Sequence, residues 1–252
     1  MRLLIVIVNY RTASLAIDCL RSLAREIPSL PPGTRVLVTD NRSGDDSVAR
    51  LTAAVRDNGW ETWARVIPLP RNGGFAYGNN EAIRPALASQ TPPDYVLLLN
   101  PDTLVRPAAV AALLEFMDAN PRVGIAGSRL EHPDGKPQRS AFRFPGALSE
   151  LEEGLRLSVV SKVLKPFVVA PPPPERACRV DWVAGASMII RRAVFDSVGL
   201  MDENYFMYYE EVDFCRRAHR AGWPCWYVPA SRIVHLVGQS SGVTDESKPK
   251  KR

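Results

Sequence analysis

Two carboxylate positions in this 252-residue chain have the setting that catalysis or metal binding requires. Asp102 closes the segment 95–102, whose apolar part, 95–99, is typical of a buried strand. Mg²⁺ and Mn²⁺ prefer oxygen ligands and usually bind one or two carboxylates together with substrate phosphates. Asp102 also precedes a predicted helix, and capping would explain it equally well.

The second position is an acidic cluster, Glu210, Glu211 and Asp213, which follows the aromatic stretch 205–209. An alcohol that attacks an electrophile must lose its proton, and a carboxylate beside it can take that proton. The aromatic neighbours would supply an apolar wall and a surface on which a sugar ring can stack. Two structural explanations stay open, because acidic side chains are favourable at a helix N-terminus and Asp213 could pair with Arg216.

A glycine- and asparagine-rich segment, 71–80, opens a further predicted helix. Backbone amides in such a segment can approach an anion or a sugar closely. The segment matches neither the GxGxxG pattern of dinucleotide-binding proteins nor the GxxxxGK pattern of P-loops. A tight turn would account for its glycines but not for its three asparagines.

Asp40 and His235 are the remaining candidates. Asp40 ends the apolar segment 36–39, where its carboxylate can accept a hydrogen bond from a nucleobase or ribose, or cap the next helix. His235 follows two apolar residues, a setting in which a lone histidine is more often structural. It becomes a metal-ligand candidate only if Asp102 lies beside it.

Alternating strand and helix patterns must position these side chains. The apolar runs and periodicities predict strands at 3–8, 35–39, 63–69, 95–99 and 123–127, and helices at 12–24, 46–58, 77–88 and 107–120. Such alternation indicates a parallel sheet covered by helices on both faces. Ligands bind such sheets beyond the carboxyl ends of the strands, and four of these ends carry polar residues: Asn9-Tyr10, Asp40-Asn41, Arg71-Asn72 and Asn100 to Asp102.

The second half of the chain is less regular. Strands are predicted at 186–190 and 226–228, and a helix at 211–221. The segment 151–169 is basic and amphipathic, so it either lies on an anionic membrane or packs on the domain with its lysines solvated. Four consecutive prolines at 171–174 form a stiff connection.

The bulk composition narrows the partners. A net charge of +5 and a pI near 9.2 favour anionic partners such as nucleotides or membrane surfaces. The basic residues are scattered outside the tail and no recognition motif is present, so no specific nucleic-acid partner is expected. The four cysteines lack CxxC spacing, which argues against a zinc site and predicts reduced, buried thiols.

The same sequence predicts a cytoplasmic protein. The apolar run at the N-terminus is too short for a signal peptide, and no stretch reaches the apolar length needed to span a bilayer. Contact with the inner face of the cell membrane would therefore be peripheral.

In their order and spacing these segments resemble the bacterial family 2 glycosyltransferases, especially the rhamnosyltransferase-like branch. The matching segments are 8–10, 39–43, 72–80, 97–102, 182–186 and 206–213, followed by His235 and Ser240-Ser241. The resemblance implies an α/β protein of the GT-A fold, with a Rossmann-like, mostly parallel sheet flanked by helices and a fused smaller acceptor-binding part. Residues 1–242 would form one domain with a nucleotide-binding half (1–128) and an acceptor-binding half (129–242), followed by a basic flexible tail (243–252).

The resemblance also implies roles for individual residues. The donor site would comprise Asn9, Tyr10, Asp40, Arg71, Asn72, Gly74, Asn80, Asn100 and Asp102. The acceptor and sugar site would comprise Trp182, Gly185, Ala186 and Tyr209. Asp102 and His235 would hold Mg²⁺ or Mn²⁺, and Glu211 would be the base, with Glu210 and Asp213 as alternatives.

Two positions depart from the common family pattern. Asn100 replaces the first acid of the usual DxD metal motif, which leaves one carboxylate, although this variant is usual in the rhamnosyltransferase-like branch. Glu211 replaces the aspartate of the usual Glu-Asp pair, and its extra methylene moves the carboxylate.

The implied function is metal-dependent transfer, with inversion, of rhamnose or another hexose from a dTDP- or UDP-linked donor. The acceptor would be a hydroxyl of a glycan or lipid-linked precursor of a cell-surface or cell-wall polysaccharide. A sugar nucleotidyltransferase is one alternative, although residues 9–13 contain no glycine for a phosphate loop. A non-catalytic glycan- or nucleotide-binding protein is the other, and homodimerisation is expected only from its general frequency.

Overall fold

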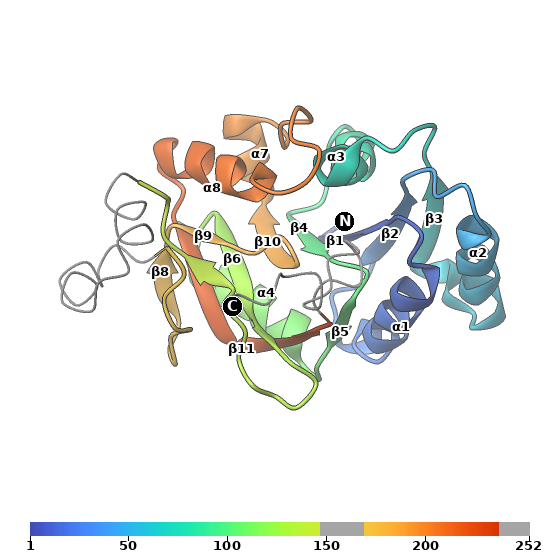
Figure 1. Cartoon of the computed structure of the whole chain (residues 1–252), viewed down its shortest axis with the longest axis horizontal. Coiled ribbons are helices and arrows are strands. Elements are labelled where there is room, and N and C mark those ends of the chain that lie inside the picture. Colours follow the sequence, from blue (N-terminus) through green and yellow to red (C-terminus); the bar gives the residue numbers. More distant parts are fainter. Residues whose placement is uncertain (147–168, 237–252) are drawn as a thin grey trace, which may run out of the picture.

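A mixed β-sheet flanked by helices forms the centre of the protein (Figure 1). The computed structural model describes residues 1–146 and 169–236. Over these ranges the main sheet has nine strands, in the order β3-β2-β1-β4-β10-β6-β11-β5, with β8 paired to β11. This arrangement confirms the predicted α/β class.

The first half of the chain builds the parallel part of the sheet, as predicted. Its strands are β1 (Leu3–Asn9), β2 (Arg35–Asp40), β3 (Ala64–Pro68) and β4 (Tyr95–Leu99). Strand β1 pairs in parallel with both β2 and β4, and β2 pairs in parallel with β3. The connecting helices are α1 (Ala13–Ala24), α2 (Ser47–Asp57) and α3 (Gly74–Leu87), with short 3₁₀ turns at Ile27–Ser29 and Trp60–Thr62.

The rest of the chain completes the sheet with mixed strand directions. Its elements are β5 (Thr103–Val105), α4 (Ala109–Ala119), β6 (Ile125–Glu131), β8 (Cys178–Val180), β10 (Ser187–Arg191), α7 (Arg192–Val198), α8 (Glu210–Arg220) and β11 (Cys225–His235). Strand β10 runs antiparallel between β4 and β6, and β11 is parallel to β6 but antiparallel to β5 and β8. A separate pair joins β7 (Ala141–Phe142) to β9 (Trp182–Val183).

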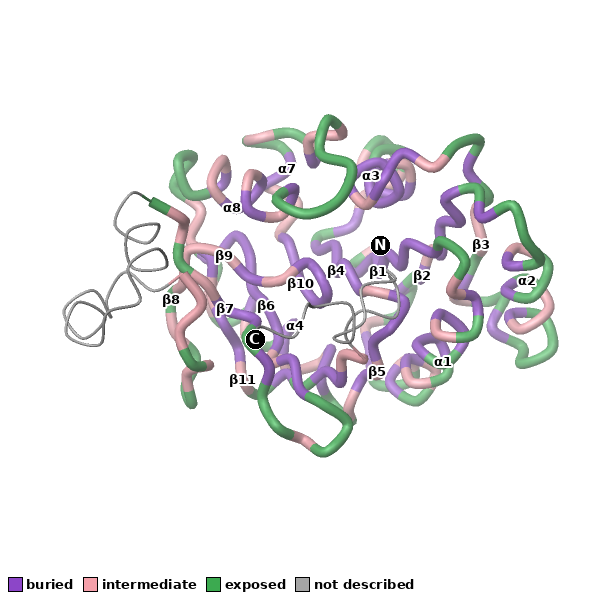
Figure 2. The backbone as a smooth tube through the Cα atoms, in the orientation of Figure 1, coloured by how far each residue is buried: buried purple, intermediate pink, exposed green. Residues whose placement is uncertain are grey.

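Strand β1 shows why an unbroken apolar run predicts a central strand. Its odd-numbered residues, such as Ile5, join the core layer that contains Leu20 of α1 and Leu113 of α4. Its even-numbered residues, such as Val6, join the opposite layer with Phe214 of α8. Both faces of β1 are therefore buried, and the purple strands at the centre of Figure 2 display this pattern.

Strand β11 is much longer than the predicted segment 226–228. Its pairing with β6 shifts register between Val228 and Arg232, around Pro229. This irregularity breaks the alternation of apolar and polar residues, so a pattern search stops at the bulge. The consequence is functional, because the continued strand carries His235 to the sheet edge beside β5.

Several predicted features lie outside the described residues: most of the basic segment 151–169, Ser240-Ser241 and the tail 243–252. Within the ranges that are described, no helix has both the length and the apolar character needed to cross a membrane.

Candidate active site

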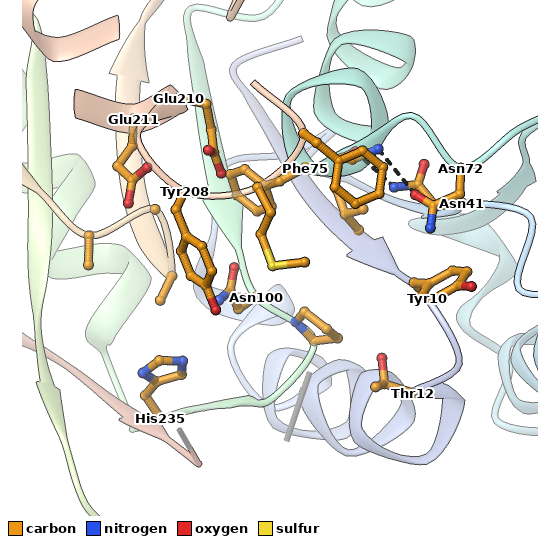
Figure 3. A pocket seen from close by; sticks show the side chains of 18 residues that line it. Tyr10, Thr12, Asn41, Asn72, Phe75, Asn100, Tyr208, Glu210, Glu211 and His235 are labelled. Carbon is orange, nitrogen blue, oxygen red and sulfur yellow. Dashed lines mark hydrogen bonds between the residues drawn. The ribbon is translucent and has the colours of Figure 1, made fainter. Parts of the chain in front are cut away.

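A pocket of about 420 Å³ lies where the strand ends converge (Figure 3). Its walls come from the ends of β1 and β4, the loop before α3, the loop before β10, the segment before α8 and the end of β11. The sequence-predicted residues that line it are Tyr10, Asn72, Gly74, Asn100, Gly185, Ala186, Glu210, Glu211 and His235. Sequence segments more than 200 residues apart thus meet in one cavity, as the carboxyl-end rule predicts.

Asp40 and Asn9 do not line this pocket. Asp40 is buried, and its carboxylate accepts hydrogen bonds from the Asn9 amide (2.7 Å) and from the Ser43 backbone N–H (2.9 Å) and hydroxyl (2.6 Å). These bonds hold the turn that follows β2. Asn41, the next residue, lines the pocket, so Asp40 helps to hold a pocket residue in place, while direct contact with a base stays a prediction.

Asn41 is a pocket residue that sequence reasoning did not select. Its Nδ2 donates to the Gly74 carbonyl at 2.9 Å, and its Oδ1 is buried without a hydrogen-bond partner among the described residues. An unpaired buried amide oxygen facing a cavity is an acceptor for a ligand N–H or O–H. Its position directly after Asp40 at a strand end was the available signal.

Asn80 and Arg71 do not line the pocket; their side chains contact the loop before α8. The Asn80 amide donates to the Met201 carbonyl (2.8 Å) and to Glu203 (2.9 Å), and it accepts from the Met201 N–H (3.2 Å). Arg71 stacks on the Tyr77 ring at 4.1 Å and lies 3.7 Å from Glu203. Both side chains thereby fasten residues 201–209, hereafter the strap, to helix α3.

The glycine-rich segment 71–80 also contacts the strap. Gly74 has φ +85°, and a Cβ there would lie 1.9 Å from the Phe206 carbonyl oxygen. That oxygen accepts a hydrogen bond from the Phe75 N–H at 3.0 Å. The close approach that this glycine permits is therefore to the strap backbone.

The end of the strap, residues 205–209, is apolar and conformationally strained. Tyr208 and Tyr209 both adopt left-handed backbone conformations, with φ of 70° and 72°. Such angles are uncommon for bulky residues and tend to cluster at functional sites. Phe206, Met207 and Tyr208 line the pocket, whereas Tyr209 is exposed outside it.

Helix α8 begins at the two glutamates that face the cavity. Burial and the adjacent charge of Glu211 raise the pKa of Glu210 to about 7, and burial also raises the pKa of Glu211. The Oε2 atoms of both residues have no hydrogen-bond partner within the described part of the chain. Glu210 is therefore suited to exchange a proton with a bound molecule near neutral pH, and the raised pKa of Glu211 makes its carboxylate a stronger base than an exposed one.

Asp213, two residues after Glu211 in helix α8, has a different environment from the two glutamates. Its carboxylate pairs with Arg217 at 2.7 Å, and Asp213 does not line the pocket. The predicted helix-surface pair thus exists with Arg217, at spacing four, instead of Arg216.

The two predicted metal ligands meet at the end of β11. The Asp102 side chain is fully buried, and its Oδ1 lies 3.6 Å from the Nε2 of His235. The Leu236 N–H donates to the Asp102 carbonyl at 2.9 Å, which fixes the two segments side by side. The condition set for His235 by the sequence is therefore met.

The side chains of Asp102 and His235 would suit a hard cation whose other ligands are oxygen atoms of the substrate. No group of three or more His, Cys, Asp or Glu side chains that could hold a metal occurs within residues 1–146 and 169–236. Mg²⁺ and Mn²⁺ do not require such a cage, because they retain waters and bind substrate phosphates alongside one or two protein ligands. A carboxylate and an imidazole 3.6 Å apart suit neighbouring coordination positions after a small adjustment.

The predicted acceptor residues divide into two groups. Gly185 and Ala186 line the pocket, and a Cβ on Gly185 would lie 3.3 Å from the Phe75 ring. Trp182 stacks on Phe142 with ring centroids 4.0 Å apart and donates its Nε1 to the Arg143 carbonyl. Trp182 therefore supports the small sheet behind the pocket and is not part of its lining.

Comparison with known proteins identifies one family of similar sequences. The model of the family described as "Glycosyltransferase like family 2" matches residues 2–250. A Mycobacterium tuberculosis protein named N-acetylglucosaminyl-diphospho-decaprenol L-rhamnosyltransferase is 31% identical over 238 residues, covering 88% of this chain and 71% of that protein. The dTDP-rhamnosyl transferase RfbF of Shigella flexneri is 24% identical, covering 82% of this chain and 61% of that protein.

Solved structures agree on the fold. The mannosyltransferase PcManGT from Pyrobaculum calidifontis, in complex with GDP-Man and Mn²⁺, aligns with a TM-score of 0.64 at 14% identity. The alignment covers 94% of this chain and 57% of that one. At this identity the likeness concerns the fold alone, and it supports the predicted GT-A architecture.

Proposed function

The chain belongs to glycosyltransferase family 2, and on that premise we propose that it transfers a hexose, rhamnose first among the candidates, from a nucleotide-diphosphate donor to a hydroxyl of a lipid-linked glycan precursor. The observation that carries this proposal is one pocket lined by Glu210 and Glu211, each with an Oε2 unpaired among the described residues, and by His235, whose Nε2 lies 3.6 Å from the buried Asp102 outside the lining. A dinucleotide-binding protein would need the GxGxxG loop, which this chain lacks at residues 71–80. A nucleotidyltransferase would need a glycine-rich phosphate loop after β1, and residues 9–13 contain no glycine.

Glu211 is the proposed base. Its carboxylate, raised in pKa by burial, takes the proton of the acceptor hydroxyl as the acceptor oxygen attacks the anomeric carbon. The new carbon–oxygen bond forms as the bond from that carbon to the donor phosphate oxygen breaks. The nucleoside diphosphate leaves with the bonding electron pair, and the configuration at the carbon inverts.

The opposite walls of the pocket suit the donor. In Figure 3, Glu210 and Glu211 enter from one side, whereas Tyr10, Asn41 and Asn72 lie across the cavity from them. Asp102 and His235 would hold the cation, and a bound cation supplies Lewis-acid stabilisation of the charge that develops on the leaving diphosphate. Strap residues Phe206 to Tyr208 exclude water from the reacting groups.

Relatives suggest the substrates. One is named for a dTDP-rhamnosyl donor activity and another for an N-acetylglucosaminyl-diphospho-decaprenol acceptor. The proposed donor is accordingly dTDP-rhamnose, with a UDP-hexose as the next candidate, and the proposed acceptor carries a polyprenyl diphosphate. Such an acceptor would bring the protein to a membrane surface as a peripheral enzyme.

The test is a panel of nucleotide sugars assayed for release of nucleoside diphosphate with Mg²⁺ or Mn²⁺, then with EDTA. We expect metal-dependent release from one donor, abolished by EDTA and strongly reduced in Asp102→Asn. Unchanged turnover in EDTA would remove the metal from the proposal. Failure to bind any donor in the panel would favour a non-catalytic binding protein.

A further inference from the structure

Gln138 contacts His235 at two points, although neither sequence pattern nor pocket lining selects it. It is buried, and its backbone N–H donates to the Leu130 carbonyl at 2.8 Å, which anchors it beside the end of β6. Its Nε2 lies 2.7 Å from the His235 carbonyl oxygen, and its Oε1 lies 3.3 Å from the His235 Nδ1.

These contacts determine which way the amide faces. A carbonyl oxygen can only accept a hydrogen bond, so the group 2.7 Å from it must be the NH₂ of Gln138. The amide oxygen then faces the His235 ring and can only accept. The His235 Nδ1 must therefore carry a proton, which leaves the lone pair of a neutral ring on Nε2.

Nε2 is the nitrogen that faces Asp102, at 3.6 Å from its Oδ1. A metal ion binds the unprotonated nitrogen of a neutral imidazole, and the partner of the other nitrogen decides which one that is. We propose that Gln138 is a positioning residue that holds His235 in the Nδ1–H tautomer and aims its Nε2 at the cation site. This inference rests on the proposed function, because it assigns a purpose to the cation site.

The same amide predicts an opposite state for a second histidine. The Nε2 of Gln138 also lies 3.2 Å from the Nδ1 of His132, which is exposed. Because the amide NH₂ donates, the His132 Nδ1 accepts, and its proton lies on Nε2. Gln138 thus places two imidazoles in opposite tautomers. If Gln138 served only to hold segment 131–138 in place, no particular tautomer of either histidine would be required.

The first test is long-range ¹H–¹⁵N NMR of the metal-free protein, recorded at about pH 8.5, where free imidazole is neutral. The chain has only three histidines, so the ring signals can be assigned by single substitutions. We expect His235 as the Nδ1–H tautomer and His132 as the Nε2–H tautomer. Gln138→Leu, which removes the acceptor that faces the His235 Nδ1, should release His235 to a mixture of tautomers.

The second test measures Mn²⁺ affinity by electron paramagnetic resonance in the presence of dTDP or UDP. Loss of an outer partner of a metal-ligating histidine typically costs on the order of 10- to 100-fold in affinity, which is the loss expected for Gln138→Leu. The matched control is His132→Phe, which removes the other contact of the same amide and should change the affinity less than about threefold.

The outcomes separate this inference from the proposed function. An unchanged His235 tautomer in folded Gln138→Leu, or equal losses of Mn²⁺ affinity in Gln138→Leu and His132→Phe, would overturn the positioning role. Wild-type protein with the expected tautomers but without Mn²⁺ binding would instead count against the metal-dependent reaction, and the tautomer assignment would stand.

Discussion

Among single residues, the three carboxylates at the start of α8 differ in what they touch. Glu210 and Glu211 face the pocket with unpaired oxygens, whereas Asp213 is neutralised by Arg217 on the helix surface. The spacing of these acids in the sequence is compatible with any of them as the base. Their side-chain environments distinguish them.

The first prediction compares two isosteric amides. Glu211→Gln should lower kcat on the order of 100- to 10,000-fold, because the acceptor proton loses its base. Asp213→Asn should stay within a few-fold of wild type, since it removes only a partly exposed ion pair. Steady-state kinetics with saturating donor measures both, and comparable rates in the two variants would refute the assignment of Glu211.

The second prediction concerns stability and pH. The pKa of Glu210 is raised from its ordinary value near 4.5 to about 7, so the folded state holds a proton that the unfolded state releases between these pH values. Stability should therefore fall as pH rises through this window, and the burial penalty is complete above it. Glu210→Gln removes the penalty, so its stability relative to wild type should rise from about pH 5 to about pH 8 by up to about 3 kcal/mol.

Urea unfolding at the two pH values measures this difference. Asp213→Asn is the control, because Asp213 is a partly exposed member of an ion pair with Arg217, and its effect should not grow over the same window. A constant difference between Glu210→Gln and wild type would mean that Glu210 is ionised in the folded protein throughout.

At the scale of elements, helix α3 and the strap form one unit. Gly74, Asn80 and Arg84 of α3 each contact the strap, through the Phe206 carbonyl, the Met201 backbone and the Glu203 carboxylate. Part of the glycine- and asparagine-rich motif therefore positions the segment that carries the pocket aromatics. Only Asn72, Gly74 and Phe75 of this motif line the cavity themselves.

The third prediction tests this unit with two glycines. Gly74→Ala places a Cβ against the Phe206 carbonyl oxygen, so it should displace the strap, lower kcat and cost more than about 2 kcal/mol of stability. Gly33→Ala is the control, because Gly33 has a similar φ of +79° with nothing within 4 Å of the added carbon. Its cost should be that of the backbone strain alone, about 1 kcal/mol, with normal kinetics. Equal effects of the two variants on stability and kcat would show that strap contact is irrelevant.

At the scale of the whole molecule, strand β10 connects the two halves of the chain. It lies antiparallel between β4 and β6, and its Arg191 donates to the carbonyls of Val123 and Met117 and to the Tyr95 hydroxyl. The proposed nucleotide-binding and acceptor-binding halves therefore share one sheet. A pocket that draws on both halves follows from this shared sheet.

The fourth prediction concerns membrane contact by the basic segment 151–169, most of which lies outside the described residues. If the segment binds an anionic surface, each basic residue near it contributes about 1 kcal/mol. Replacing Arg156, Lys162 and Lys165 with glutamine should then lower partitioning onto anionic vesicles on the order of 10- to 100-fold, measured by flotation. Neutral vesicles are the control, and unchanged flotation would favour a segment packed on the protein.

The sequence by itself determined the α/β class, the central strands and half of the residues that line the pocket. These properties follow from local patterns: an apolar run buried on both faces defines a strand such as β1, and polar residues placed directly after it reach the ligand-binding edge. Family resemblance adds roles for Glu211, Asp102 and His235, which the strand ends alone leave open.

Only the tertiary structure decided which polar residues face the cavity and which hold it in place. Asn9 and Asn80 have the same residue type as pocket residues such as Asn41, yet their side-chain amides bond to Asp40 and Met201, which are distant in sequence. The register shift in β11 interrupts the periodic pattern, so the sequence does not reveal that the strand continues to His235. The contacts of His235 with Asp102 and Gln138 depend on that continuation. Long-range pairing sets these environments, because a side chain's hydrogen-bond partners are fixed by packing and not by its own neighbours in the chain.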